Sequence, residues 1–196
     1  MAAQRKHRAA VVEAAATLFR RHGYAASGLA DIVAASGAPK GSLYHYFPDG
    51  KDAIGAAAVA FAAARVTATL EQLAARHAHA GAMLRAYAAL LAGWMAKSGF
   101  RDGCPITTTV LETVPASQAI AAAAADGFAR WQAIFVGALR RDGVAPARAD
   151  RLARFAIAAL EGALILARVA QSPRAITEAA EEAAALFDAA RKKTRS

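Results

Sequence analysis

The chain has 196 residues, of which 57% are hydrophobic and 20% are charged, and its formal net charge is +9. This length suits one domain of ordinary size with a small extra head, and the apolar content can fill a core without disulfides. One cysteine excludes an intrachain disulfide, the N-terminal MAAQRKHR lacks a secretory signal, and the longest uncharged apolar run, residues 53–64, is too short to cross a bilayer. We therefore expect a soluble, cytoplasmic protein with no membrane partner.

Basic residues are spread along the whole chain. Residues 1–52 hold seven Lys and Arg against four acidic residues, so they carry +3 of the net charge. The remaining excess comes from segments 140–141, 148–154 and 191–193, which are typical of solvated helix faces and a frayed terminus rather than of a second nucleic-acid site. Such charge favours nonspecific DNA affinity but selects no sequence.

The first predicted helix spans residues 4–22, and its inward face consists of Val11, Ala14, Ala15, Leu18 and Phe19. Residues 27–47, SGLADIVAASGAPKGSLYHYF, then predict two short helices separated by a tight turn. Ser27 is a suitable N-cap for the first, since its hydroxyl can accept from the amides of the opening turn. Gly37 can adopt the left-handed conformation of the turn, and Pro39 fixes φ for the second helix.

The second short helix turns Leu43 and Phe47 toward the core, because these residues lie four apart. Its outward set consists of Lys40, Gly41, Ser42, Tyr44, His45 and Tyr46. A cation, a residue without a side chain, hydroxyls and ring donors are what phosphate contact and close approach to base edges require. This helix is therefore predicted to meet double-stranded DNA.

Glycine, proline and serine divide the rest of the chain into further helices. Asp49, with Asp52 three residues later, is expected to cap a long helix that reaches His77 and connects head to body. Later helices are expected between Gly81 and 97–99, from the loop 100–105 to near Pro115, over 117–141, and on either side of Ser172-Pro173. No segment alternates like a strand, so the prediction is an all-α fold of about nine helices.

The order and spacing of residues within 5–54 resemble the TetR family of bacterial transcriptional repressors. The matching residues are Arg8, Ala14, Leu18, Phe19, Gly23, Tyr24, Asp31, Ile32, Gly37, Lys40, Gly41, Ser42, Leu43, Tyr44, Phe47 and Lys51. Three short motifs resemble its LmrA/YxaF-type subgroup: residues 37–42 with an extra glycine at Gly50, then 103–105, and 161–164 followed by 167–168. The resemblance implies a three-helix helix-turn-helix DNA-binding domain at 1–50 and a helical-bundle ligand-binding and dimerisation domain at 51–196.

Contacts with operator DNA are expected at Arg5, Lys6, Ser27, Gly28, Lys40, Gly41, Ser42, Tyr44, His45, Tyr46 and Lys51. The sequence departs from the family pattern at Gly28 and Ala30, where relatives commonly carry polar or basic residues, and at Pro39, which replaces the usual hydroxyl cap. Clamping of the DNA backbone is therefore expected to depend more on Arg5, Lys6, Ser27, Tyr44, His45 and Lys51.

The penultimate helix is apolar nearly all round, so it needs two packing partners. One can be the body of its own subunit and the other a second copy, with the last helix completing a four-helix interface. The resemblance implies the same homodimer. The expected interface residues are Leu152, Phe155, Ala159, Gly162, Leu166, Ile176, Ala183, Leu186 and Phe187.

Large side chains gather on the helices of the body, in a chain otherwise rich in alanine. Such a stripe is commonly core, but very small and very large residues together can leave space for a ligand. The resemblance implies an effector pocket here, and from these side chains we expect a mostly apolar or aromatic molecule. The expected lining is Phe61, Met83, Tyr87, Leu91, Trp94, Met95, Cys104, Phe128, Trp131 and Phe135, with Glu112 and Arg168 as polar anchors.

Cys104 admits three interpretations: a small buried hydrophobe, a pocket-lining residue as the subgroup resemblance suggests, or a thiol activated by a helix N-terminus. The five histidines show no metal-ligand spacing, and no catalytic motif or cofactor fingerprint occurs. The sequence thus predicts a homodimeric, ligand-responsive repressor that reads a pseudo-palindromic operator. The alternatives are a non-allosteric or architectural DNA-binding protein with a filled core and, in another class, a helical enzyme.

Overall fold

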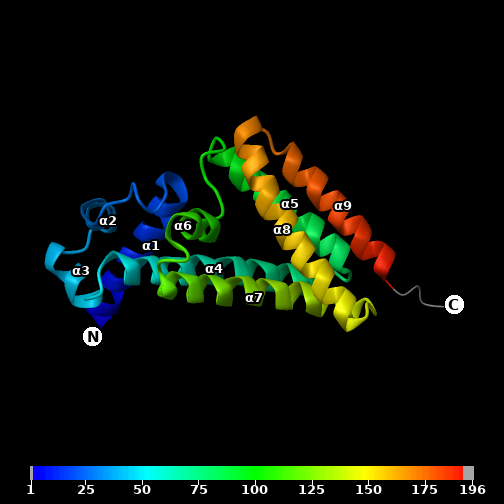
Figure 1. Cartoon of the computed structure of the whole chain (residues 1–196), viewed down its shortest axis with the longest axis horizontal. Helices are drawn as coiled ribbons and strands as arrows, with labels where there is room; N and C mark the ends of the chain where they lie inside the picture. The colour runs from blue at the N-terminus through cyan, green and yellow to red at the C-terminus, as the bar shows by residue number, and fades with distance from the viewer. Residues whose placement is uncertain (1, 192–196) are drawn as a thin grey trace. The chain divides into compact units, whose positions relative to one another are not determined.

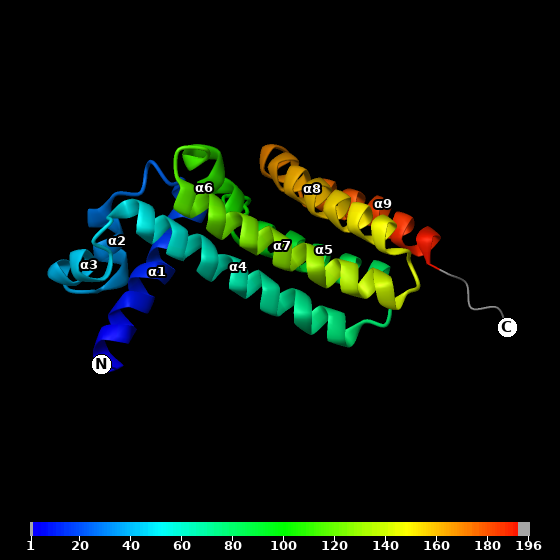
Figure 2. The ribbon, with the colours of Figure 1, turned by 60° about the horizontal axis from the view of Figure 1, so that its bottom comes forward.

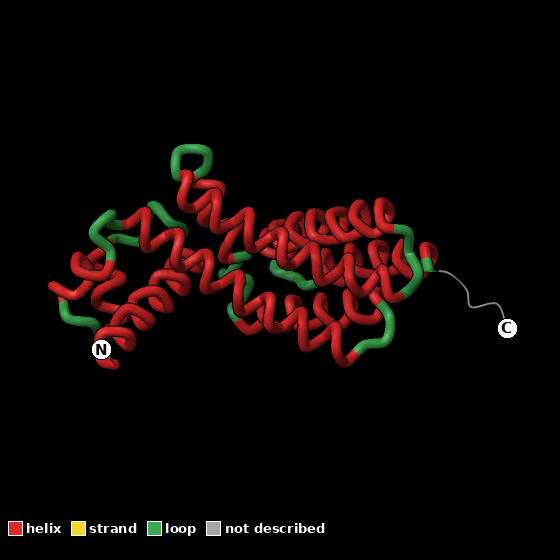
Figure 3. The backbone as a smooth tube through the Cα atoms, turned by 90° about the horizontal axis from the view of Figure 1, so that it is seen from below, coloured by secondary structure: helices red, strands yellow, loops and turns green. Residues whose placement is uncertain are grey.

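The computed structural model describes residues 2–191, apart from the side chains of residues 2–5, Lys40 and Ser42. Within this part of the chain every regular element is a helix (Figures 1 and 3), which confirms the all-α prediction. The nine helices are α1 (Ala2–His22), α2 (Leu29–Ser36), α3 (Lys40–Tyr46), α4 (Lys51–Arg76), α5 (Ala80–Lys97), α6 (Pro105–Thr113), α7 (Gln118–Arg141), α8 (Pro146–Ala170) and α9 (Arg174–Ala190).

The chain forms two compact units. The first comprises residues 1–65 and 104–128, and the second comprises residues 66–103 and 129–196. The long helices α4 and α7 each contribute one part to either unit. The predicted boundary between the DNA-binding domain and the ligand-binding domain lies at residue 50, at the end of the helix-turn-helix segment, and not at a boundary between the two units. This division into domains stays a prediction.

The first unit has its own hydrophobic core. Helix α1 packs against α2, α3 and α6 (Figure 2), and the start of α4 adds buried apolar side chains to the core. The core consists of Val11, Val12, Ala15, Phe19, Ile32, Ala38, Leu43, Phe47, Ile54 and Ala58. The periodicity of the sequence therefore predicted Val11, Ala15 and Phe19 correctly as inward residues of α1, whereas Ala14 is only partly buried and the buried Val12 was not predicted.

Two helix starts differ from the sequence-based expectation. Helix α2 begins after Gly28, and the hydroxyl of Ser27 donates to the carbonyl of Gly23 at 2.8 Å instead of capping the helix. The Asp31 carboxylate accepts the N–H of Gly28 at 2.9 Å and so stabilises this start. Helix α4 likewise follows Gly50, whose carbonyl accepts the N–H of Ile54, so Asp49 is not its N-cap.

The second unit is built on α5, α8 and α9, with α9 packed along both of the others. Its aromatic side chains contact one another edge to face: ring centroids are 6.5 Å apart between Tyr87 and Phe135 and 6.3 Å apart between Phe135 and Phe187. At one end, the Asp142 carboxylate accepts the N–H of Ala80 at 2.8 Å and lies 2.9 Å from Nδ1 of His79. These contacts tie α7 to both α5 and α9.

Helix α4 alone, among the described helices, is long and apolar enough to cross a membrane by length and composition. This property is weak evidence for a membrane span, because core helices of water-soluble proteins share it. In α4 the side chains of Ile54, Val59 and Leu70 are buried in protein. Of the apolar window of α4, 39% is buried in protein, so packing explains part of its apolar character.

Candidate nucleic-acid interface

Helix α3 has one buried and one exposed face. Leu43 and Phe47 are buried in the first unit's core, whereas Gly41 and His45 are exposed and the Tyr44 side chain is 62% exposed. Tyr46 is half-buried and packs on the core, with its ring centroid 5.2 Å from that of His45. The helix therefore presents hydroxyl and ring donors on a surface that its own fold does not cover.

The turn before α3 has the geometry expected of a helix-turn-helix. Gly37 ends α2 with φ of 63°, in the left-handed region that a side chain makes costly. Pro39 follows with φ of −57° and directly precedes the first residue of α3. Both expectations about this turn are confirmed, and they fix how α3 projects from the core.

The other predicted DNA contacts lie in different environments. Lys6 is exposed on α1, while Ser27 is buried and its hydroxyl is used inside the protein. Gly28 is the N-cap of α2 and therefore lies at the N-terminus of this helix. The side chains of Arg5, Lys40 and Ser42 lie outside the described part of the structure.

Lys51 is half-buried and held by the turn between α1 and α2. Its Nζ lies 4.4 Å from the ring centroid of Tyr24 and donates to the carbonyl of Ala25 at 3.4 Å. Burial, and secondarily the carboxylate of Asp52, raise the pKa of Tyr24. The lysine that begins α4 is thereby placed beside the segment that leads into α2.

Glu112 on α6 holds the same turn from another side. Its carboxylate accepts the N–H of Tyr24 at 3.0 Å and that of Ala25 at 2.7 Å. Gly23 makes this possible, since it has φ of +86° and a side chain there would collide with Glu112. Residues 24 and 112 are far apart in the chain and no local pattern pairs them, so this role could not be predicted from the sequence.

Family models match both parts of the chain. Residues 11–58 match the model described as bacterial regulatory proteins, tetR family, and residues 80–182 match the C-terminal domain of LmrA/YxaF-like transcriptional regulators. The chain belongs to the TetR family. Both the family and the subgroup predicted from the sequence are confirmed, and the TetR family consists of transcriptional regulators rather than enzymes.

Relatives extend this match over most of the chain. The uncharacterized HTH-type transcriptional regulator Rv0196 of Mycobacterium tuberculosis is 35% identical over 164 residues, which cover 81% of this chain and 82% of the relative. YxaF of Bacillus subtilis is 30% identical, with 80% and 82% covered, and LmrA of the same organism is 27% identical, with 83% and 86% covered. The crystal structure of the TetR regulatory protein from Rhodobacter sphaeroides superposes with a TM-score of 0.79 at 25% identity, covering 90% of this chain and 96% of that one.

The side chains predicted to bind an effector divide between the two units of this TetR-family chain. Phe61, Cys104, Glu112 and Phe128 belong to the first unit, and the other eight belong to the second. Cys104 is buried at the start of α6, in keeping with a small hydrophobe or a lining residue. Glu112 accepts the N–H groups of residues 24 and 25, a structural role that its prediction as an effector anchor did not include.

In the second unit the predicted effector residues are mostly interior. Those buried are Met83, Tyr87, Leu91, Met95, Trp131 and Phe135. Trp94 is 45% exposed and Arg168 is exposed, so both lie at the surface of the unit. To bind in this unit, an effector would have to enter a compact aromatic interior that has Trp94 at its edge.

Helix α8 divides its apolar residues between two faces. Leu152 and Ala163 are buried inside the second unit, whereas Phe155, Gly162 and Leu166 are exposed and Ala159 is partly exposed. Two further exposed residues that were not predicted at the interface, Ile165 and Val169, belong to this outer face. They recur at helical spacing, a signal that was present in the sequence.

Helix α9 shows a similar division. Ile176, Ala183 and Phe187 are buried against the unit's own core, while Leu186 is 39% exposed. The three buried side chains therefore stabilise the subunit and do not present themselves to a partner. Leu186 alone among the four predicted interface residues of α9 offers apolar surface there.

Proposed function

We propose that this chain is a cytoplasmic, ligand-responsive transcriptional repressor that binds a pseudo-palindromic operator as a homodimer. The observation that carries the proposal is the exposed face of α3, with Gly41, Tyr44 and His45, in a helix-turn-helix of the TetR family. Close backbone approach at a glycine and donors from side-chain hydroxyl and imidazole groups suit a major groove. Lys6 and Lys51 would contribute the phosphate contacts that set the register.

The outer face of α8 supports a homodimer. Phe155, Ile165, Leu166 and Val169 are exposed large apolar residues on one helix, and Leu186 of α9 is the fifth. Monomeric proteins rarely leave such a set uncovered on neighbouring helices. A second copy, placed by a two-fold axis, would bury the same face on both chains. Two heads joined in this way would read half-sites about 34 Å apart, or a multiple of that distance.

The interior of the second unit supports an apolar or aromatic effector. Met83 can change its shape to accommodate a ligand, and buried Trp131 can orient one through its ring and N–H group. Trp94, at the surface of the same unit, would lie where the ligand enters. The effector can release DNA only if it binds the DNA-incompetent arrangement more tightly than the competent one.

A second candidate function follows from the contacts among Tyr87, Phe135 and Phe187. These rings fill part of the interior that an effector would occupy, which favours a DNA-binding protein without allosteric release. The two functions differ in one measurable quantity, the coupling free energy between ligand and operator. A coupling of about 1–3 kcal/mol would lower operator affinity about 5- to 150-fold.

The proposal is tested first with DNA. An operator is selected from random duplexes with the wild-type protein, and its affinity is then compared for Tyr44→Ala and for Leu111→Ala, a control on exposed α6 surface. Loss of a base-edge contact at Tyr44 should cost about 1–3 kcal/mol, while the control should bind as the wild type does. Equal affinities for all three proteins would remove α3 from the DNA interface.

The effector is tested by titrating a panel of planar aromatic compounds into free and operator-bound protein. A ligand that releases the DNA must bind the operator complex more weakly than it binds the free protein. The factor is the same as the one by which the ligand lowers operator affinity. Trp94→Ala and Trp131→Ala should reduce ligand affinity more than DNA affinity. A ligand with equal affinity for both states would support the non-allosteric function.

A further inference from the structure

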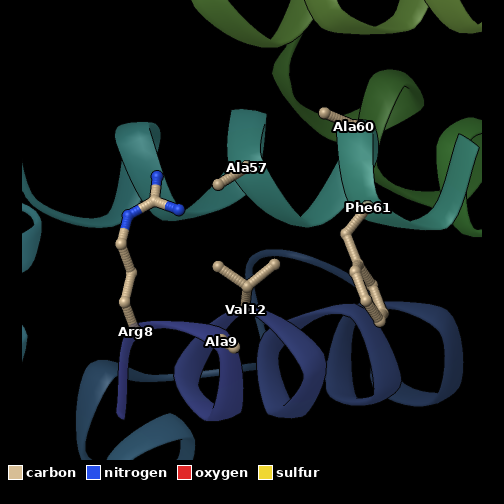
Figure 4. A pocket seen from close by; sticks show the side chains of 6 residues that line it. All are labelled: Arg8, Ala9, Val12, Ala57, Ala60 and Phe61. Carbon is tan, nitrogen blue, oxygen red and sulfur yellow. The ribbon is translucent and has the colours of Figure 1, made fainter. Parts of the chain in front are cut away.

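A groove in the first unit carries chemistry that operator binding does not use. It has a volume of about 300 Å³ and lies between α1 and the first part of α4 (Figure 4). Its lining consists of Arg8, Ala9 and Val12 from α1 and Ala57, Ala60 and Phe61 from α4. This volume is at the lower limit of small-molecule sites, and alanine and valine side chains form most of its walls.

The two ends of the groove differ in character. Arg8 extends from α1 toward α4 beside Ala57, and Phe61 extends from α4 back toward α1 (Figure 4). One end therefore presents a guanidinium group and the other an aromatic ring. A molecule that fits between them needs a compact apolar body and a negatively charged group at one end.

Neighbouring contacts hold both end groups in place. The guanidinium carbon of Arg8 lies 5.1 Å from the ring centroid of Phe47, and that of Arg65 lies 5.8 Å from the ring centroid of Phe61. A cation–π contact uses the face of a guanidinium, while a carboxylate binds the N–H groups at its edge. Arg8 can thus keep its contact with Phe47 and still bind an anion.

Charge also distinguishes the two ends. Glu13 approaches Arg65 at 3.9 Å, so the cation near Phe61 has an acidic neighbour. Of the six residues that line the groove, Arg8 alone is charged, and it is exposed. The Arg8 end therefore favours an anion, and the Phe61 end favours an uncharged ring or alkyl chain.

We propose that this groove is a second small-molecule site, for amphipathic carboxylates that pair with Arg8 and pack on Ala57, Ala60 and Phe61. It is distinct from the effector site proposed in the second unit, and it does not depend on operator binding. The site would give the DNA-binding unit a ligand of its own. Because α1 and α4 both contribute to the core beneath α3, the ligand would bind helices that support the recognition helix.

The test uses 2-naphthoate and octanoate as probes of the full-length protein, with 2-naphthylmethanol as the uncharged analogue. Saturable binding of a carboxylate is measured by calorimetry and by perturbation of NMR signals from α1 and α4. Arg8→Gln should weaken carboxylate binding about ten- to a hundredfold, as expected for loss of a charged hydrogen bond, and should leave the alcohol unchanged. Ala60→Phe should fill the groove and abolish binding of both compounds.

Arg151→Gln, at an exposed arginine of α8, is the matched control and should leave carboxylate affinity unchanged. Circular dichroism checks that each variant is folded, and Arg8→Lys serves as a second variant that keeps the charge and should bind with intermediate affinity. Binding that is lost in Arg168→Gln or Trp131→Ala but retained in Arg8→Gln would place the ligand in the second unit and overturn the proposal. Absence of saturable binding for both carboxylates would overturn it as well, whatever the protein's affinity for operator DNA.

Discussion

The carboxylate of Glu112 accepts the backbone N–H of Ala25 at 2.7 Å, across 87 positions of sequence. Its other oxygen accepts the N–H of Tyr24 at 3.0 Å. Both N–H groups belong to the turn between α1 and α2. In the same turn, the carbonyl of Ala25 accepts a hydrogen bond from Nζ of Lys51, which belongs to α4. Helix α6 and the start of α4 therefore hold the segment that leads into the helix-turn-helix.

Glu112→Ala should destabilise the protein by about 1–2 kcal/mol, because two N–H groups lose a charged acceptor at a partly solvated site. Glu112→Gln should have a smaller effect, since its amide oxygen can still accept one of the two hydrogens. The free energy of unfolding in urea measures both effects. Glu182→Ala, at an exposed position of α9, is the control and should be close to the wild type. Equal stability of Glu112→Ala and the control would contradict the structural role.

Two glycines with positive φ should differ in their tolerance of a side chain. At Gly37 a Cβ atom would meet open space, so Gly37→Ala should cost only the strain of a left-handed residue, about 1–2 kcal/mol. At Gly23 the Cβ atom would also collide with Glu112 and displace its hydrogen bonds, so Gly23→Ala should cost more. In the double variant with Glu112→Ala, the collision is absent and the two costs should be less than additive. Strict additivity in urea unfolding would show that Gly23 and Glu112 do not interact.

Tyr24 should make stability depend on alkaline pH. Burial and the neighbouring Asp52 raise the pKa of Tyr24 above 10.0, so the folded state favours the neutral phenol. This contribution is fully present below pH 10 and is lost as the pH rises through the folded-state pKa. Between about pH 9 and 11, Tyr24→Phe should therefore lose less unfolding free energy than the wild type. Tyr46→Phe is the control, and a Tyr24→Phe curve parallel to the wild type would refute the prediction.

Two adjacent residues of α9 should separate dimerisation from folding. Leu186 is 39% exposed, so Leu186→Arg should leave the subunit folded and dissociate the proposed homodimer. Phe187 is 1% exposed and packs on Phe135, so Phe187→Arg should destabilise the subunit by at least about 3 kcal/mol. Sedimentation velocity and circular dichroism distinguish the two results. A wild-type monomer at micromolar concentration, or a Leu186→Arg dimer as stable as the wild type, would exclude this interface.

Local physical chemistry made much of the fold predictable from the sequence. Helical periodicity identified Leu43 of α3 and Phe47 at its C-cap as inward residues, and the backbone preferences of Gly37 and Pro39 identified the turn. These properties depend on residues within a few positions of one another, so they can be inferred without knowing the rest of the structure. The family resemblance rested on residues 5–54, which include this segment.

Only the tertiary structure decided which neighbours cover each face. An all-round apolar α8 does not reveal that Leu152 faces the core while Leu166 and Val169 remain exposed, because periodicity describes the helix and not its surroundings. Likewise, Ser27 has the chemistry of an N-cap, yet its hydroxyl donates to Gly23 because the turn folds back on α1. Glu112 acquired its role in the same way, since chain packing and not local sequence brings its carboxylate to the N–H groups of residues 24 and 25.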